Sequence, residues 1–284
     1  FFNKGAEAIF GWTPSEIIGQ RIETLIPERF RTNHARQVEE FARSKVKARR
    51  MGDRRQIAGV RKGGAEFPAE AAISQVQQGD DVVFTVVLRD VTIRKRFEQR
   101  QQFLAEAGEK LATAFGSSET LTKVAWLAVP TIADGCILEN RVGNGFLAGA
   151  SAHVNPDIEK TLDDICEAGV RIPPNDHPLA EILQTSAPVL LQSNAAARLM
   201  ASSKNPAYLK AMTAMNPQSA LFLPLVAREQ LIGAMTLFRA TRPFDSDDVG
   251  FAEDLARRAA LALDNARLPD TVRPSLDRQR TRRN

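Results

Sequence analysis

The segment Arg89-Asp90-Val91-Thr92 constrains the fold of this chain more than any other part of its sequence. The apolar run at residues 82–88 before it predicts a β-strand, and the polar segment after it, with apolar residues every seven positions, predicts a helix. Asp and Thr side chains accept hydrogen bonds from the free N–H groups at the start of a helix. We therefore expect a β-sheet that leads directly into a long helix, and Arg89, Asp90 and Thr92 are the candidate coupling residues.

The length and composition indicate a soluble chain with about two domains. It has 284 residues, of which 43% are hydrophobic and 25% are charged, ordinary values for globular proteins. No apolar run is long enough to span a membrane, and no signal peptide is evident. Because the chain begins without Met, in what reads as mid-strand, we expect a fragment whose parent could be anchored upstream. Cys136 and Cys166 lack metal-ligand spacing and indicate a reducing cytoplasm.

Residues 1–92 predict a small α+β domain. Thr13, Pro14 and Glu16 have the spacing of a capping box with proline at the first helical position. A longer helix is expected at residues 31–48. Strands are expected at residues 56–62, 66–76 and 82–88, and the glycine-containing turns between them predict an antiparallel meander.

Residues 93–115 predict a helical linker. Phe97, Leu104 and Leu111 are seven residues apart, and Arg100, Ala107 and Ala114 occupy the second seam position. This period is typical of a two-stranded coiled coil, so we expect a homodimer through this linker and the C-terminal helix. The alternative is a single amphipathic helix that packs on its own domain.

Residues 116–268 predict a second α+β domain. Strands are expected at residues 135–139 and 145–152, which should form a hairpin, at 188–191, and at 220–226 and 231–238, which should form a second hairpin. Asp245 to Asp248 should cap a long helix. Residues 269–284, with two prolines and five arginines, predict a disordered basic tail. Nucleic-acid binding is not expected of it, because no aromatic residue is interleaved to stack on bases.

The first domain carries a set of short motifs in a fixed order. They are Asn3 with residues 6–12 (AEAIFGW), residues 16–19 (EIIG), 25–27 (LIP), 61–68 (RKGGAEFP) and 89–92 (RDVT). Together they resemble a PAS domain. Gly63 stands where that family usually has Asp, and most of the family's opening strand and its hairpin partner are missing. The resemblance therefore implies an unpaired sheet edge.

The second domain is similar to a GAF domain. The residues that carry this resemblance are 124–125 (VA), 133–136 (ADGC), 219–225 (SALFLPL), 231–237 (LIGAMTL), Phe244, 252–256 (AEDLA) and 262–268 (ALDNARL). The sequence of these segments is similar to that of GAF domains that follow PAS domains in bacterial sensor histidine kinases and in PP2C-type phosphatase regulators. The expected fold class is α+β, with two antiparallel-sheet sensor domains joined by a long helix.

No catalytic or cofactor motif is evident. None of His34, His153 and His177 lies in the helical His-Glu motif of a kinase transmitter, and no phosphate-binding glycine loop occurs. Flavin-thiol PAS relatives use a reactive cysteine, which residues 1–92 lack. Haem-binding PAS relatives have a ligand histidine after the long helix, where residues 46–50 have none. Bilin-binding GAF relatives have a cysteine beside a histidine, which is absent, so the cofactor is unknown and no metal is expected.

Both resemblances imply a sheet wrapped around an apolar interior that could hold a small ligand. The candidate lining residues of the PAS domain are Phe10, Trp12, Ile18, Leu25, Phe41, Phe67 and Val87. Those of the GAF domain are Phe146, Leu223, Leu225 and Leu237. A filled core is the alternative in both domains.

We therefore expect a signal-sensing input module of a two-component-type protein. A small ligand or partner would change the sheet, and the coupling residues would pass that change into the linker helix. One alternative is a thiol-dependent GAF-type redox enzyme that uses Cys136 and Cys166. Another is the input part of a PP2C-type phosphatase. The parent is expected to be a histidine kinase whose catalytic domain is absent from this sequence.

Overall fold

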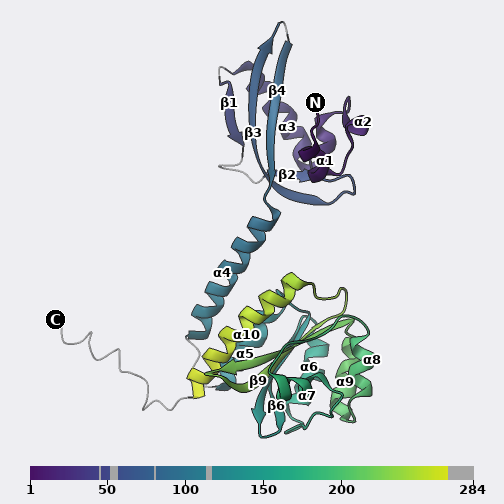
Figure 1. The fold of residues 1–284 in the computed structure, drawn as a ribbon, viewed down its shortest axis with the longest axis vertical. Helices are drawn as coiled ribbons and strands as arrows, with labels where there is room; N and C mark the ends of the chain where they lie inside the picture. The colour runs from purple at the N-terminus through teal and green to yellow at the C-terminus, as the bar shows by residue number, and fades with distance from the viewer. Residues whose placement is uncertain (45, 52–56, 80, 113–116, 268–284) are drawn as a thin grey trace, which may run out of the picture. The chain divides into compact units, whose positions relative to one another are not determined.

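A computed structural model describes residues 1–44, 46–51, 57–79, 81–112 and 117–267 of the chain. The chain divides into two compact units, unit 1 at Phe1–Gln101 and unit 2 at Gln102–Asn284 (Figure 1). Each unit combines helices with one antiparallel sheet, which confirms the predicted α+β class. The predicted tail at 269–284 lies outside the described residues. Within the described residues, no helix has the length and apolarity needed to cross a membrane.

The first two helices of unit 1 begin at polar capping residues. The Asn3 side chain accepts a hydrogen bond from the Ala6 N–H, and the predicted capping box of Thr13 and Glu16 is confirmed. Pro14 is the first residue of its helix, where its missing N–H costs nothing. The helical elements are α1 (Lys4–Phe10), α2 (Pro14–Ile17), the 3-10 helix η1 (Ile22–Leu25) and α3 (Glu28–Arg43).

The sheet of unit 1 is built around its longest strand, which pairs antiparallel with the other three. The strands are β1 (Ala48–Met51), β2 (Ile57–Val60), β3 (Glu66–Gln78) and β4 (Asp81–Asp90). The predicted helix at residues 31–48 is wrong at its C-terminal end, because α3 stops at Arg43. Ser44 is extended, and Ala48 already pairs with Ser74 in the sheet.

Helix α4 (Thr92–Ala112) follows β4 directly, as predicted from the sequence. The prediction that Leu104 and Leu111 form a coiled-coil seam with a second chain needs correction. Leu104 and Leu111 are buried in the core of unit 2, where Phe103 makes an edge-on contact with Phe251 at 5.1 Å between ring centroids. The C-terminal half of α4 therefore packs on its own domain. Phe97, the first residue of the predicted seam, is exposed.

The sheet of unit 2 has the strand order β6-β5-β9-β8-β7, with antiparallel pairs throughout. Both predicted hairpins are confirmed. Arg228 and Glu229 form the second hairpin turn with positive φ angles of 47° and 64°, as a tight turn between twisted strands requires. The strands are β5 (Gly135–Val142), β6 (Gly145–His153), β7 (Val189–Leu191), β8 (Ser219–Ala227) and β9 (Gln230–Arg239).

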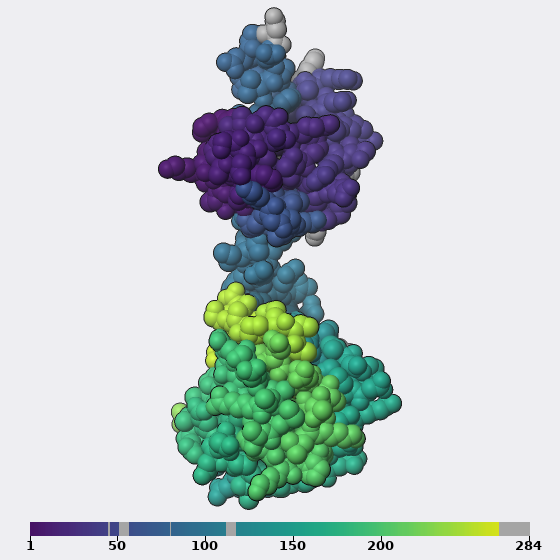
Figure 2. All heavy atoms as spheres, turned by 90° about the vertical axis from the view of Figure 1, so that its right-hand side faces the viewer, coloured from purple at the N-terminus to yellow at the C-terminus, as the bar shows by residue number. Residues whose placement is uncertain are grey.

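Helices cover both faces of this sheet (Figure 1). One core lies between the sheet and the end of α4, α5 (Ser117–Ala128) and α10 (Ser246–Arg267). The other core lies against α6 (Pro156–Cys166), α7 (Pro178–Thr185), α8 (Ala195–Ala201) and α9 (Pro206–Met215). In the space-filling view, the green segment that holds α8 and α9 forms a continuous outer surface of unit 2 (Figure 2).

The four lining residues predicted for the second domain do not face one interior. Leu223, Leu225 and Leu237 belong to the core against α5 and α10, whereas Phe146 belongs to the core against α6 to α9. Successive side chains of a strand point to opposite faces, so apolar residues of a two-sided sheet divide between two cores. The prediction of a single lining set is wrong for this reason.

Candidate functional site

The junction between β4 and α4 is organised by the Asp90 carboxylate. Asp90 Oδ1 accepts hydrogen bonds from the Thr92 N–H at 2.8 Å and the Thr92 hydroxyl at 2.5 Å. Its Oδ2 accepts one from Arg61 Nη2 at 2.5 Å. Arg61 also donates to the Ile9 carbonyl, and its guanidinium lies 4.5 Å from the Phe67 ring centroid. One carboxylate therefore ties the last residue of the sheet, the first residue of α4 and the helix α1 together.

The electrostatics of this junction favour the charged form of Asp90. Partial burial acts to raise the pKa of Asp90, but the hydrogen bonds from Thr92 and Arg61 outweigh it and hold that pKa below its usual value. Arg89, the third predicted coupling residue, is exposed and lies opposite Glu70 in the register. Arg61 occupies the place in this network that the sequence interpretation gave to Arg89.

The predicted lining residues of the PAS domain divide into three groups. Phe10, Leu25 and Phe67 share one buried core with Ile17 and Ala69, and Trp12 packs against it. Phe41 is buried outside that core, with its ring 6.1 Å from that of Phe84.

Ile18 and Val87 are 59% and 70% exposed, so neither lines an interior. Ile17 and Leu88, one position away, contact the core instead. For Val87 the reason is that neighbouring residues of a strand point to opposite faces, whereas Ile18 is the C-cap residue that follows α2. A surface hollow of about 630 Å³ lies elsewhere in unit 1 and is lined by Arg21, which precedes η1, and by residues of η1 and α3 that include Glu23 and Arg31.

A buried polar cluster lies on the α6–α9 side of the unit 2 sheet. Glu139 of β5 is only 1% exposed and pairs with Arg171 Nη2. The Arg171 guanidinium lies 5.3 Å from the ring centroid of Tyr208 in α9. His177 Nε2 is 3.2 Å from the Tyr208 hydroxyl, while His177 Nδ1 accepts a hydrogen bond from the Leu179 N–H. We call Glu139, Arg171, His177, Tyr208 and Thr236 the interior cluster.

Burial sets the protonation states of the interior cluster. It lowers the pKa of His177 to about 4, and the nearby positive charge of Arg171 adds to this effect. It raises the pKa of Tyr208 and the pKa of Glu139, although Arg171 opposes the shift of Glu139. At neutral pH the histidine and the tyrosine are therefore neutral, and they surround a single buried ion pair.

Two polar atoms of the interior cluster lack partners among the described residues, namely Thr236 Oγ1 and Arg171 Nε. The register places Thr236 opposite Ile137 and Phe222, which belong to the core on the α6–α9 side. Glu139 is two residues from Ile137 on the same strand, so it faces the same side. Buried polar groups without partners are rare and are candidates for contact with water or a ligand.

The sequence interpretation did not single out the interior cluster as a site. One signal was available, because Glu139 interrupts the otherwise apolar start of β5. A second was that Tyr208 is the one tyrosine in the sequence. The partners of these residues come from distant segments, and no spacing rule brings them together.

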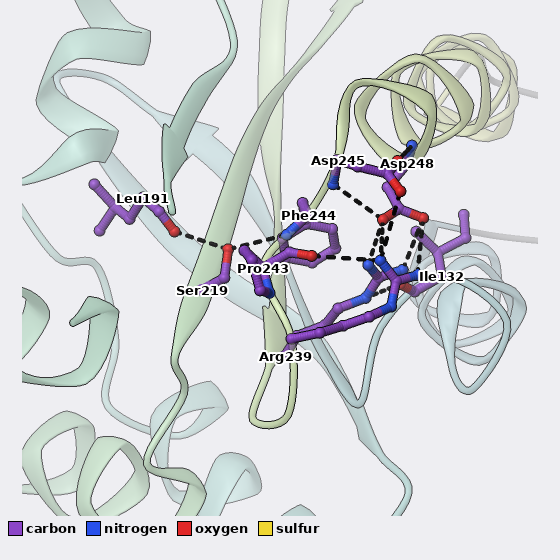
Figure 3. A network of polar contacts seen from close by, with 9 residues as sticks. Ile132, Leu191, Ser219, Arg239, Pro243, Phe244, Asp245 and Asp248 are labelled. Atoms are coloured by element: carbon purple, nitrogen blue, oxygen red, sulfur yellow. Dashed lines mark hydrogen bonds and ion pairs between the residues drawn. The ribbon is translucent and has the colours of Figure 1, made fainter. Parts of the chain in front are cut away.

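A second strand–helix junction connects β9 to α10 (Figure 3). Arg239 Nη1 and Nη2 donate to the two carboxylate oxygens of Asp248 at 2.5 and 3.0 Å, and its Nε donates to the Ile132 carbonyl at 2.9 Å. Asp245 and Asp248 also exchange backbone-to-carboxylate hydrogen bonds at the helix start. Burial acts to raise the pKa of Asp248, but Arg239 and Arg242 hold it well below its usual value.

The chemistry of the described residues does not favour a reactive thiol or a metal centre. Burial raises the pKa of Cys136 and the pKa of Cys166, which disfavours the nucleophilic thiolate. Among the residues with described positions, no three His, Cys, Asp or Glu side chains are grouped so that they could hold a metal ion.

Comparison with known proteins identifies the domains. A model of the GAF domain matches residues 99–263, more than half of the chain, and a model of the PAS domain matches residues 1–92. Sensor protein FixL of Bradyrhizobium diazoefficiens is 29% identical over 171 residues, which are 60% of this chain and 33% of FixL. Oxygen sensor protein DosP of Escherichia coli is 30% identical over 105 residues, which are 37% of this chain and 13% of DosP. The chain thus spans a third or less of these relatives.

Solved structures with a similar fold include the GAF domain of the Acinetobacter phosphoenolpyruvate-protein phosphotransferase. It has a TM-score of 0.47 and 13% identity, and the match covers 59% of this chain and 94% of that one. Another is the chromophore-binding domain of the Stigmatella aurantiaca bacteriophytochrome, with a TM-score of 0.42, 14% identity and coverage of 90% and 87%. The chain belongs to the GAF domain family, and a PAS domain precedes its GAF domain.

Proposed function

We propose that this chain is the signal-sensing input module of a two-component-type signalling protein. A ligand or partner changes the packing of a sensor domain, and helix α4 carries that change along the chain. The observation that carries the proposal is the Asp90 carboxylate, which binds both the sheet-side Arg61 and the helix-side Thr92. Two curated relatives are named as sensor proteins, which supports the same conclusion.

The proposed transmission step is a change between two packing states of the junction. Movement of β4 changes the position of Asp90, and Thr92 then starts α4 with a different geometry. Since Leu104 and Leu111 of the same helix are part of the unit 2 core, the helix has a fixed attachment at its other end. The parent is proposed to be a histidine kinase, with a PP2C-type phosphatase as the alternative parent.

Unit 2 offers a second proposed input, a stimulus site for a small molecule at the interior cluster. Its two unpartnered polar atoms support this assignment. We further propose a cytoplasmic homodimer that forms through the exposed apolar side chains of α4 and α10, namely Ile93, Phe97 and Leu261. The thiol-dependent enzyme has less support, because both cysteines have raised pKa values.

The transmission proposal is tested with Asp90→Ala in the full chain. Solution scattering and sedimentation should show a changed shape and a changed monomer–dimer equilibrium, because the capped start of α4 is lost. The matched control is Asp81→Ala at the exposed opposite end of β4, which should behave as the native chain. If the two variants give identical profiles, the coupling role of Asp90 is wrong. Native mass spectrometry of the purified chain tests separately for a retained ligand.

A further inference from the structure

The segment between α6 and α7 presents two side chains inward, those of Arg171 and His177, and most of the others outward. We call residues 167–177 the strap. Val170 and Ile172 are exposed, whereas the Arg171 side chain between them is only 16% exposed and reaches Glu139. The Arg171 backbone exchanges two hydrogen bonds with Phe146, of 2.8 and 2.7 Å, which form an isolated bridge to β6. The position of the strap therefore depends strongly on Arg171.

The surroundings of the Arg171 guanidinium have the composition of a site for an organic cation. The Glu139 carboxylate supplies the opposite charge, and the electron-rich face of Tyr208 lies 5.3 Å from Arg171 Cζ. A carboxylate and an aromatic face are the two groups that recognise guanidinium and ammonium ions in proteins. Thr236 faces the same side of the sheet, with a hydroxyl that can accept a hydrogen bond from such an ion.

The burial of Glu139 makes the guanidinium hard to remove without a replacement. A carboxylate that is 1% exposed loses its solvation, and an unpaired charge in that position is strongly destabilising. The strap can therefore leave its position only when another cation or a proton neutralises Glu139. A small cation that binds between Glu139 and Tyr208 satisfies this requirement.

We propose that Arg171 is a tethered occupant of a cation site, and that a small ligand with a guanidinium or primary ammonium group displaces it and releases the strap. This inference rests on the proposed role of the interior cluster as the stimulus site and names the chemical class of its ligand. The strap joins α6 to α7, so its release changes the packing of helices on this face of the sheet. No covalent step is involved.

Cys166, the last residue of α6, reports on the position of the strap. It is half-buried, which raises its pKa, and the charges of Glu139 and Arg171 have smaller, opposite effects on that pKa. Cys136 is fully buried on the other face of the sheet and serves as an internal reference in the same molecule. The rate at which a thiol reagent modifies each cysteine therefore separates opening of the strap from general unfolding.

The test uses the full chain with methylguanidinium and its neutral analogue N-methylurea at equal, non-denaturing concentrations. Methylguanidinium should speed modification of Cys166 by about tenfold, which corresponds to about 1.4 kcal/mol in the opening equilibrium. N-methylurea should have no effect, and Cys136 should stay unmodified. Arg171→Ala should open the strap without any probe, and methylguanidinium should then raise the melting temperature of that variant.

Glu139→Gln provides the matched control, because it keeps the size of the side chain and removes the charge that binds the cation. It should abolish the response to methylguanidinium. If Arg171→Ala does not fold, the rate of Cys166 modification in Arg171→Lys and in the native chain still shows whether methylguanidinium displaces the side chain at position 171. Equal responses to the two probes, or an unchanged response in Glu139→Gln, overturn the proposal. A ligand found by native mass spectrometry that binds without changing Cys166 leaves the input-module function intact and contradicts only the displacement.

Discussion

Each of the two strand–helix junctions of this chain contains an arginine–aspartate ion pair, but the two pairs are buried to different extents. In unit 1, the Arg61 and Asp90 side chains are 35% and 22% exposed, whereas in unit 2 the Arg239 and Asp248 side chains are 8% and 13% exposed. In both, an arginine binds a carboxylate at the start of a helix. An ion pair near water contributes little and can rearrange, while a buried pair is costly to break. The first junction is therefore suited to transmission and the second to anchoring.

The largest expected effect is at the buried junction. Arg239→Ala removes the more buried of the two arginines that bind Asp248, and it also removes the donor to the Ile132 carbonyl. Loss of one member of a buried pair costs about 3–5 kcal/mol in the free energy of unfolding. Urea unfolding followed by the fluorescence of Trp126, with Trp12 replaced by Phe, measures unit 2 alone. Arg242→Ala is the control, since that more exposed arginine binds the same Asp248. Equal losses in the two variants would remove the distinction between the junctions.

Asp90→Ala should have an intermediate effect on unit 1. It removes the cap of α4 and a partly exposed ion pair, which together contribute about 1–2 kcal/mol. Urea unfolding followed by Trp12, with Trp126 replaced by Phe, reports this loss. Asp81→Ala should leave the midpoint unchanged. A loss as large as that of Arg239→Ala would mean that the first junction is an anchor too.

Lowering the pH should decrease the stability that the buried junction contributes. Because the folded pKa of Asp248 is depressed, its stabilisation is fully present above the unfolded pKa and is lost as the pH falls through the range below about 4. The stability of Asp248→Asn should therefore depend less on pH between about 4 and 2 than that of the native chain. Parallel pH profiles of unfolding free energy for the two proteins would contradict this expectation.

The smallest expected effect is at the exposed pair of Lys62 and Glu16. The hydrogen bond from Lys62, with those from Thr13, lowers the pKa of Glu16 to about 2, but water screens this exposed pair. Glu16→Gln keeps the capping oxygen for Thr13 and removes the charge. The urea midpoint of unit 1 should stay within experimental error of the native value. A clear decrease would show that exposed pairs in unit 1 matter as much as the junction.

Local rules of sequence were sufficient for much of the fold. Alternating apolar residues and turn glycines predicted the hairpins of both sheets, and Asp90 with Thr92 predicted the start of α4. These features depend on neighbours in the chain. Ile18 and Val87 show the limit, because an error of one position exchanges an exposed side chain for a buried one.

Features that depend on distant contacts were not predictable in the same way. Leu104 and Leu111 repeat with the heptad period whether their partner is a second chain or α10, so the period did not distinguish the two. The pairing of Arg171 with Glu139 joins residues 32 positions apart in sequence. Arg61 was part of a recognised motif, but its bond to Asp90 required the folded sheet.

The proposed role of Asp90 is to connect the state of the unit 1 sheet to helix α4. Hydrogen–deuterium exchange of Arg61→Gln, compared with the native chain, tests it most directly, because this variant changes the sheet side of the junction and leaves α4 itself unaltered. If Asp90 makes this connection, exchange should be about tenfold faster or more in the first half of α4, with a smaller increase in residues 102–112. Unchanged exchange along the whole of α4 would show that Asp90 does not connect the sheet to the helix.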